Sequence, residues 1–316
     1  MNIPVKIREK SNILLAGAGG GFDFLCALPV ALLLLEEGHT VHVASYSFTA
    51  LKKVKNARCL TDNIIEITEK STLEGSEYFP EFFLSQWFKE KKGISMPVYC
   101  FPTAGIKSLR KAYIFLKESL HLDCVFIVDG GVDGIFRGDE FALGTPSMDA
   151  ISIIAASLSD FQNSYYAMTA FGTEGVNKEV SHADVLERIS ELIKKDKFYG
   201  LSALLKHTRI GREFIDGATY IFDRMKPEYR STIVSSILKA MDGNFGDMAV
   251  NEKTAERPVW VSPLTLLYWF FDLEAVAKMK LYYSESLNTD SVFDVVEIIE
   301  KTRSSETHRI RKSIPI

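Results

Sequence analysis

Short apolar runs alternate with longer amphipathic or apolar segments along the first half of the chain. Residues 12–17 form the first run, a glycine-rich turn follows, and residues 22–38 are apolar almost all the way round a helix. Residues 40–45 return to a strand pattern. This order of strand, glycine turn, helix and strand is typical of a right-handed βαβ unit in a parallel sheet.

The same alternation resumes further along the chain. Strands are predicted at 64–67, 97–101, 123–129 and 165–171, and helices at 78–88, 106–121 and 146–158. After Gly175 the pattern turns helical, with helices expected near 183–195, 209–224, 230–241, 263–280 and 291–303 and one short strand at 258–261. We therefore predict one Rossmann-like α/β domain over residues 1–316 with a mainly parallel open sheet. Residues 1–180 are expected to form the sheet, and residues 181–316 to be mostly helical.

The loop at residues 129–140 is the most informative stretch. The predicted strand ends at Asp129, and the glycine-rich loop after it carries three more acids, Asp133, Asp139 and Glu140. Ligands of open α/β sheets bind outside the carboxyl ends of the strands, so a polar loop there predicts a site. Clustered carboxylates can hold Mg²⁺, accept hydrogen bonds from sugar hydroxyls or transfer protons. Aspartates beside glycines also form turns by bonding their own backbone, which would account for one or two of these acids.

The turn at residues 17–21 lies where a phosphate-binding loop would lie. Its free amides could hold an anionic or carbonyl oxygen, or the glycines could simply form a tight turn under a buried helix. Asp23 suits a hydroxyl acceptor, a metal ligand or a helix cap. Phe22 stands where the dinucleotide fingerprint needs its third glycine, and the second strand ends without the acid that binds a ribose. An NAD site is therefore not expected.

The end of the next strand, at residues 169–175, supplies Glu174 as a further candidate general base. Arg137 could clamp a substrate anion or pair with a neighbouring acid. Thr145 and Asp149 are interpreted as the cap and first turn of a helix, which are structural roles. The predicted catalytic residues are Asp129, Asp133, Glu140 and Glu174. The predicted ligand-binding residues are Gly19, Gly20, Gly21, Asp23, Gly130, Gly131, Arg137, Asp139 and Thr173. If a metal is bound, Mg²⁺ held by Asp129 and Asp133 is expected.

Composition narrows the class of protein. The chain has 316 residues, 47% of them hydrophobic, and a net charge of −4 without a basic cluster, so nucleic acid is not an expected partner. The longest apolar run, residues 24–35, contains Pro29 and is shorter than the roughly 20 residues that span a bilayer. It follows a glycine loop rather than a basic segment, which does not fit a signal peptide. The four cysteines are scattered, as structural thiols are. A cytoplasmic protein is expected.

The segment from Trp260 to Phe271 is unusually aromatic. We expect it to belong to the core, and the alternative is a lid or a contact between subunits of a homo-oligomer.

Several motifs together resemble a known family. They are the turn Gly19-Gly20-Gly21-x-Asp23, the loop from Asp129-Gly-Gly-x-Asp133 to Gly138-Asp139-Glu140, Gly144-Thr145-Pro146, and Tyr268-Trp269-Phe270-Phe271-Asp272-Leu273. The combination resembles the domain-of-unknown-function family 1152, found mostly in prokaryotes, over most of the chain. The resemblance implies one α/β unit in which these loops act together, and it carries no established activity.

We therefore expect a small-molecule enzyme, a hydrolase, lyase or group transferase acting on a polar, hydroxylated substrate such as a nucleotide or sugar derivative. In this hypothesis the amides of residues 17–21 hold an oxygen of the substrate, and Asp129 and Asp133 bind hydroxyls or a divalent metal. Glu140 or Glu174 moves the proton. The alternative is a non-catalytic ligand sensor or assembly protein that uses the same pocket.

Overall fold

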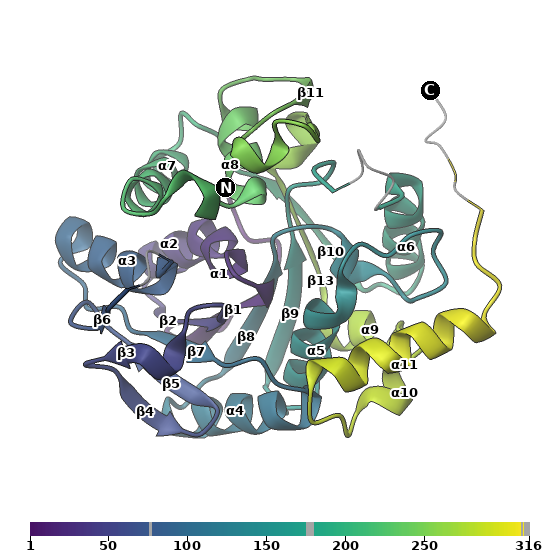
Figure 1. Ribbon diagram of the computed structural model, residues 1–316, viewed down its shortest axis with the longest axis horizontal. Helices are drawn as coiled ribbons and strands as arrows, with labels where there is room; N and C mark the ends of the chain where they lie inside the picture. Colours follow the sequence, from purple (N-terminus) through teal and green to yellow (C-terminus); the bar gives the residue numbers. More distant parts are fainter. Residues whose placement is uncertain (76–77, 175–179, 311, 313–316) are drawn as a thin grey trace.

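The computed structural model describes residues 1–75, 78–174, 180–310 and 312, and within them a nine-stranded sheet forms the centre of the fold (Figure 1). The strand order is β10-β13-β9-β8-β1-β2-β7-β5-β4. The strands are β1 (Asn12–Gly20), β2 (Thr40–Tyr46), β4 (Arg58–Thr61), β5 (Ile64–Ile67), β7 (Val98–Phe101), β8 (Cys124–Asp129), β9 (Asn163–Met168), β10 (Phe198–Ala203) and β13 (Leu267–Asp272). The short strands β3 (Val54–Lys55) and β6 (Thr72–Leu73) pair with each other, as do β11 (Gly246–Met248) and β12 (Val259–Val261).

The middle of the sheet is parallel, and both of its sides are antiparallel. Strands β7, β2, β1, β8 and β9 run parallel to one another, whereas β5, β4, β13 and β10 join with antiparallel pairing. Every residue of β8 is buried, as expected for a parallel strand covered on both faces. The prediction of a mainly parallel α/β sheet is thus confirmed.

Helices cover both faces of the sheet and enclose two apolar cores. One face carries α1 (Asp23–Cys26), α2 (Leu28–Glu36), α3 (Pro80–Trp87), α7 (Arg209–Phe222) and α8 (Thr232–Met241). The other carries α4 (Ile106–Ser119), α5 (Pro146–Ser157), α6 (His182–Lys194), α9 (Leu273–Lys278) and α11 (Val292–Ser305), with α10 (Tyr283–Ser286) beside α11. Short helical turns are η1 (Leu51–Lys53), η2 (Phe88–Lys92), η3 (Asp133–Ile135), η4 (Pro227–Tyr229), η5 (Glu252–Thr254) and η6 (Pro263–Leu266). None of the helices in the described ranges is long and apolar enough to cross a membrane.

The predicted helix at 263–280 is wrong. This segment forms the turn η6, then strand β13, and only then the helix α9. Ser262 and Thr265 cap the turn, and the aromatic run that follows pairs on both sides, with β9 and with β10. The apolar run fits a buried helix as well as a buried strand, so its pattern alone does not separate the two. Pairing within the sheet buries the run, and aromatic residues favour the strand.

The C-terminal part completes the sheet as well as covering it. Strands β10 and β13 both come from the region expected to be mostly helical, and β10 was not predicted at all. Tyr268, Phe270 and Phe271 are completely buried in β13, so these three aromatic side chains are core residues. The predicted helix at 22–38 is divided into α1 and α2 at Ala27, two residues before Pro29.

Candidate acidic site

A cavity of about 210 Å³ lies at the carboxyl ends of the central strands β1 and β8. Five carboxyl groups line it: Asp23, Asp129, Asp133, Asp149 and Glu174. Four of them, all except Asp149, lie at or after the three strand ends at which sequence analysis placed the site. The parallel direction of β1, β8 and β9 is the reason that these ends meet.

Asp23 begins α1, and two glycines allow its side chain to lie against the backbone. Its Oδ2 accepts a hydrogen bond of 2.7 Å from the Gly19 amide. A Cβ atom on Gly19 would lie 2.9 Å from this oxygen, and one on Gly130 would lie 2.7 Å from Oδ1. Any larger residue at either position would displace the carboxylate. These two glycines, one at the end of β1 and one after β8, therefore make room for an acid. The Gly19 amide donates its hydrogen bond to Asp23 rather than to a ligand.

Asp129, Asp133 and Glu174 are each held by a backbone amide. Asp129 ends β8, and its Oδ2 accepts hydrogen bonds from the Gly134 amide at 3.1 Å and from the Tyr166 hydroxyl at 2.5 Å. Asp133 Oδ2 accepts from the Thr145 amide at 2.7 Å, and Glu174 Oε2 accepts from the Val132 amide at 2.7 Å. In each group one carboxylate oxygen is tied to the protein, which orients the other.

Asp149 is the fifth acid of the cavity. It lies in the first turn of α5, and only 6% of its surface is exposed. Oxygen atoms of Asp23, Asp129 and Asp149 lie within 4.8 Å of one another. Metal–oxygen distances of about 2.0–2.6 Å allow ligands of one ion to be up to about 5 Å apart, so the three carboxylates fit a single divalent cation.

The pKa values of all five carboxyl groups are raised. Burial, opposed by its bonds to backbone amides, raises the pKa of Asp23 to about 7, and burial likewise raises the pKa of Asp133 to about 6. For Asp129, Asp149 and Glu174, burial and then the charges of the neighbouring acids raise the pKa well above the usual range. A bound cation would relieve both causes, because it replaces lost hydration and cancels the repulsion.

Lys280 is a functional candidate that sequence analysis missed. Its ammonium is buried behind the acidic loop and donates to the backbone carbonyls of Gly134 at 2.8 Å and Phe136 at 3.1 Å. Burial lowers its pKa to about 8, although the charges of the nearby acids oppose this. Its positive charge in turn lowers the pKa of Asp133. A lysine just after α9 carries no sequence signal of this role.

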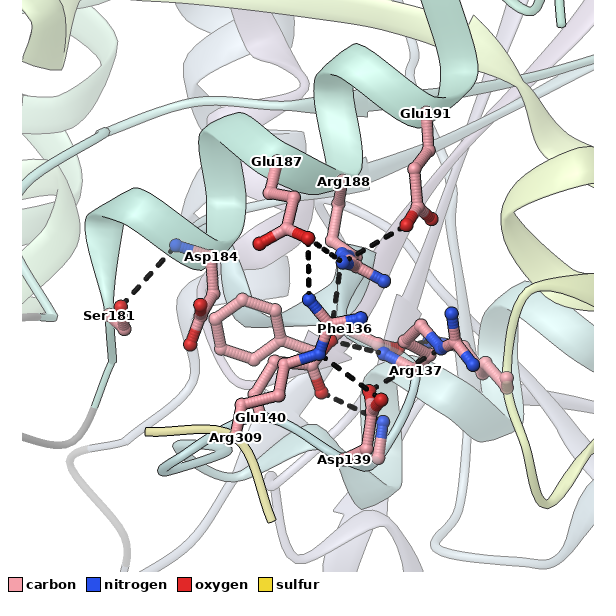
Figure 2. A network of polar contacts seen from close by, with 12 residues as sticks. Phe136, Arg137, Asp139, Glu140, Ser181, Asp184, Glu187, Arg188, Glu191 and Arg309 are labelled. Atoms are coloured by element: carbon pink, nitrogen blue, oxygen red, sulfur yellow. Dashed lines mark hydrogen bonds and ion pairs between the residues drawn. The ribbon is translucent and has the colours of Figure 1, made fainter. Parts of the chain in front are cut away.

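Glu140, Arg137 and Asp139 lie in a different polar network, outside the cavity lining (Figure 2). Glu140 accepts hydrogen bonds from the amides of Arg137 and Gly138, and its Oε1 is 3.9 Å from Nε of the buried Arg188. Asp139 pairs with Arg137 at 3.4 Å and with Arg309 at 3.1 Å. The turn η3 begins at Asp133 and lies between the acids of the cavity and those of this network.

The remaining predicted site residues surround the acids to different degrees. Gly20 and Gly130 line the cavity, and a Cβ on Gly131 would lie 2.5 Å from Glu174 Oε1. The Gly21 amide donates a hydrogen bond to the Tyr46 carbonyl, and the Thr173 hydroxyl donates one to the Ala170 carbonyl.

Comparison with known proteins places the chain in a family without giving it an activity. No curated protein shows a significant match to it. The sequence profile of the family described as "protein of unknown function (DUF1152)" matches residues 14–306, so the expected resemblance is confirmed and the chain belongs to this family.

Proposed function

We propose that the protein is a divalent-cation-dependent enzyme that acts on a polar, hydroxylated small molecule by hydrolysis, elimination or group transfer. The single observation that carries the proposal is the position of Asp149. This buried acid lies with Asp23 and Asp129 at metal-ligand spacing, and burial and the charges of the neighbouring acids raise its pKa well above the usual range. Buried carboxylates this close together are costly unless a cation or a proton neutralises them.

The residues divide into two groups by what they can do. Asp23, Asp129 and Asp149 would hold the cation, and the amides of Gly19 and Gly134 keep the first two in position. When bound, a divalent cation would polarise an oxygen of the substrate or of water.

Asp133 and Glu174 lie beside this group and would handle protons. Each has one oxygen tied to a backbone amide. A carboxyl group whose pKa is raised to about 6, as at Asp133, can both accept and return a proton near neutral pH. This arrangement supports a reaction in which a proton moves while charge develops on an oxygen beside the cation. We further propose that the protein acts in the cytoplasm, where its four free cysteines would stay reduced.

Titration of EDTA-treated protein with Mn²⁺ in a calorimeter tests the cation site. We expect one strong site in the wild type and at least tenfold weaker binding in Asp149→Asn, because a buried charged ligand is lost. The matched control is Asp247→Asn, an exposed acid on β11. Failure of the wild type to bind Mn²⁺, or undiminished binding by Asp149→Asn, would contradict the proposal.

The enzyme is distinguished from a ligand sensor by what happens to a bound molecule. Native mass spectrometry of the purified protein identifies any small molecule that accompanies it. Incubation of that molecule with Mn²⁺ and fresh protein should convert it, and Asp133→Asn should slow the conversion. A molecule that stabilises the fold and is recovered unchanged would favour the sensor.

A further inference from the structure

The acidic cavity is too small for a whole substrate. Pockets that enclose a ligand of metabolite or drug size usually measure about 300–1,000 Å³, whereas this cavity measures about 210 Å³. A cation with a compact polar group, such as a phosphate or a pair of hydroxyls, would fill it. The rest of any larger substrate must therefore lie at the mouth of the cavity.

The mouth has an apolar side, in contrast to the acidic floor. Phe48, Met148 and Ile233 line the same cavity as the five acids. Phe48 stands out among them, because 49% of its surface is exposed although it sits beside a deeply buried cluster. Its ring lies against the backbone of the glycine turn, where a Cβ on Gly20 would overlap it. Glycine at position 20 thus leaves room for an aromatic ring at the entrance.

A buried carboxylate anchors residues close to this ring in the chain. Glu81, on α3, is completely buried and accepts hydrogen bonds from the hydroxyls of Ser45 at 3.0 Å and Thr49 at 2.7 Å. The Ser47 hydroxyl accepts from the Thr49 amide at 3.0 Å, and the Ser47 amide donates to the Phe101 carbonyl at 2.9 Å. Ser47 and Thr49, on either side of Phe48, are therefore anchored and buried, whereas the Phe48 ring between them is exposed.

We infer that Phe48 is a recognition platform for a ring of the substrate, whose polar end reaches the acidic floor. The ring is a nucleobase or the apolar face of a sugar, and Glu81 is a positioning residue that acts through Ser45 and Thr49. Stacking of such a ring on an exposed phenyl ring makes the free energy of binding more favourable. Stacking on an aromatic side chain also accepts many ring types. This inference rests on the proposed function, since the acids would repel an anionic group in the absence of a cation.

Calorimetry in the presence of Mn²⁺ tests the inference with four probes: AMP, UMP, glucose 1-phosphate and inorganic phosphate. The first three carry a ring, and inorganic phosphate is the ringless reference. We expect at least one ring probe to bind the wild type about tenfold or more tightly than phosphate does. AMP or UMP as the best probe would indicate a nucleobase, and glucose 1-phosphate would indicate a sugar.

The variants show whether Phe48 supplies this gain. Phe48→Ala should abolish the gain in affinity of the ring probe over phosphate and leave phosphate binding unchanged. Phe48→Tyr should retain this gain in affinity. Phe293→Ala is the matched control, because Phe293 is 80% exposed on α11, and it should behave as the wild type. Thr49→Val removes one hydroxyl from Glu81 and should lose part of the gain.

Each contrary result has a separate meaning. If the wild type binds Mn²⁺ but no ring probe exceeds phosphate, or if Phe48→Ala keeps the gain, the ring platform is refuted and the cation site stands. If Thr49→Val keeps the whole gain, the positioning role of Glu81 is refuted. If Mn²⁺ does not bind to the wild type, the proposed function fails and takes this inference with it.

Discussion

Replacing Asp133 by asparagine is expected to stabilise the metal-free protein at neutral pH. Asp133 is 3% exposed, and burial raises its pKa from 3.8 to about 6. A pKa that is higher in the folded than in the unfolded state means that the folded state binds more protons between these two values. The group's contribution to stability is therefore complete below about pH 4 and is lost as the pH rises through about 6.

The magnitude follows from the pKa. A rise from 3.8 to about 6 corresponds to about 3 kcal/mol, at about 1.4 kcal/mol per pH unit. Asparagine is neutral at every pH and keeps an oxygen that can accept the hydrogen bond from the Thr145 amide. The variant should match the wild type near pH 4 and be about 3 kcal/mol more stable near pH 7.

Urea denaturation in EDTA, at several pH values from 4 to 8, measures this difference. Asp247→Asn, at an exposed position, serves as the control and should show no such divergence from the wild type. A variant that is less stable than the wild type by the same amount at every pH would refute the reasoning. In that case Asp133 would serve the fold only as a hydrogen-bond acceptor.

Two further substitutions test the packing around the site. Gly134→Ala places a Cβ 2.5 Å from Asp129 Oδ2 and 2.7 Å from the Tyr166 hydroxyl. The variant should be about 1–3 kcal/mol less stable in urea denaturation and should bind Mn²⁺ more weakly. Unchanged Mn²⁺ affinity would show that Asp129 is not a ligand. Arg188→Met should cost about 3 kcal/mol because it leaves Glu140 buried without its cation, and adding Glu140→Gln should recover part of that loss. A double variant no more stable than Arg188→Met would contradict this account of the network in Figure 2.

The sequence predicted the part of the site that local order and topology determine. Asp23 and Asp129 follow apolar strands, and parallel strands bring their carboxyl ends to one edge, so their meeting could be expected. Glu140 could not be separated from Asp133 in the same way, because the direction of a loop depends on a turn such as η3 that composition does not specify.

The residues that were missed depend on tertiary contacts. An acid in the first turn of a helix has a sufficient local reason to be there, so Asp149 gave no sign that it faces other acids. Lys280 is 131 residues beyond Asp149 in the chain, and the buried Glu81 that anchors Thr49, beside Phe48, is 32 residues away. Strand β13 was predicted as helix because an all-apolar run has no period that separates the two structures.

The position of β13 has a consequence for how the chain is made. Strand β9 pairs with β8 on one side and with β13 on the other, yet β13 is synthesised only after α6, β10, α7 and α8. During synthesis β9 therefore remains an open edge, the kind of surface on which chains pair wrongly. Lys280 comes after β13 and α9 in the chain. The acidic loop therefore also lacks the buried ammonium of Lys280 until this part of the chain is made. A ribosome-bound chain that ends before residue 267 should consequently need a chaperone or a cation more than the finished protein does.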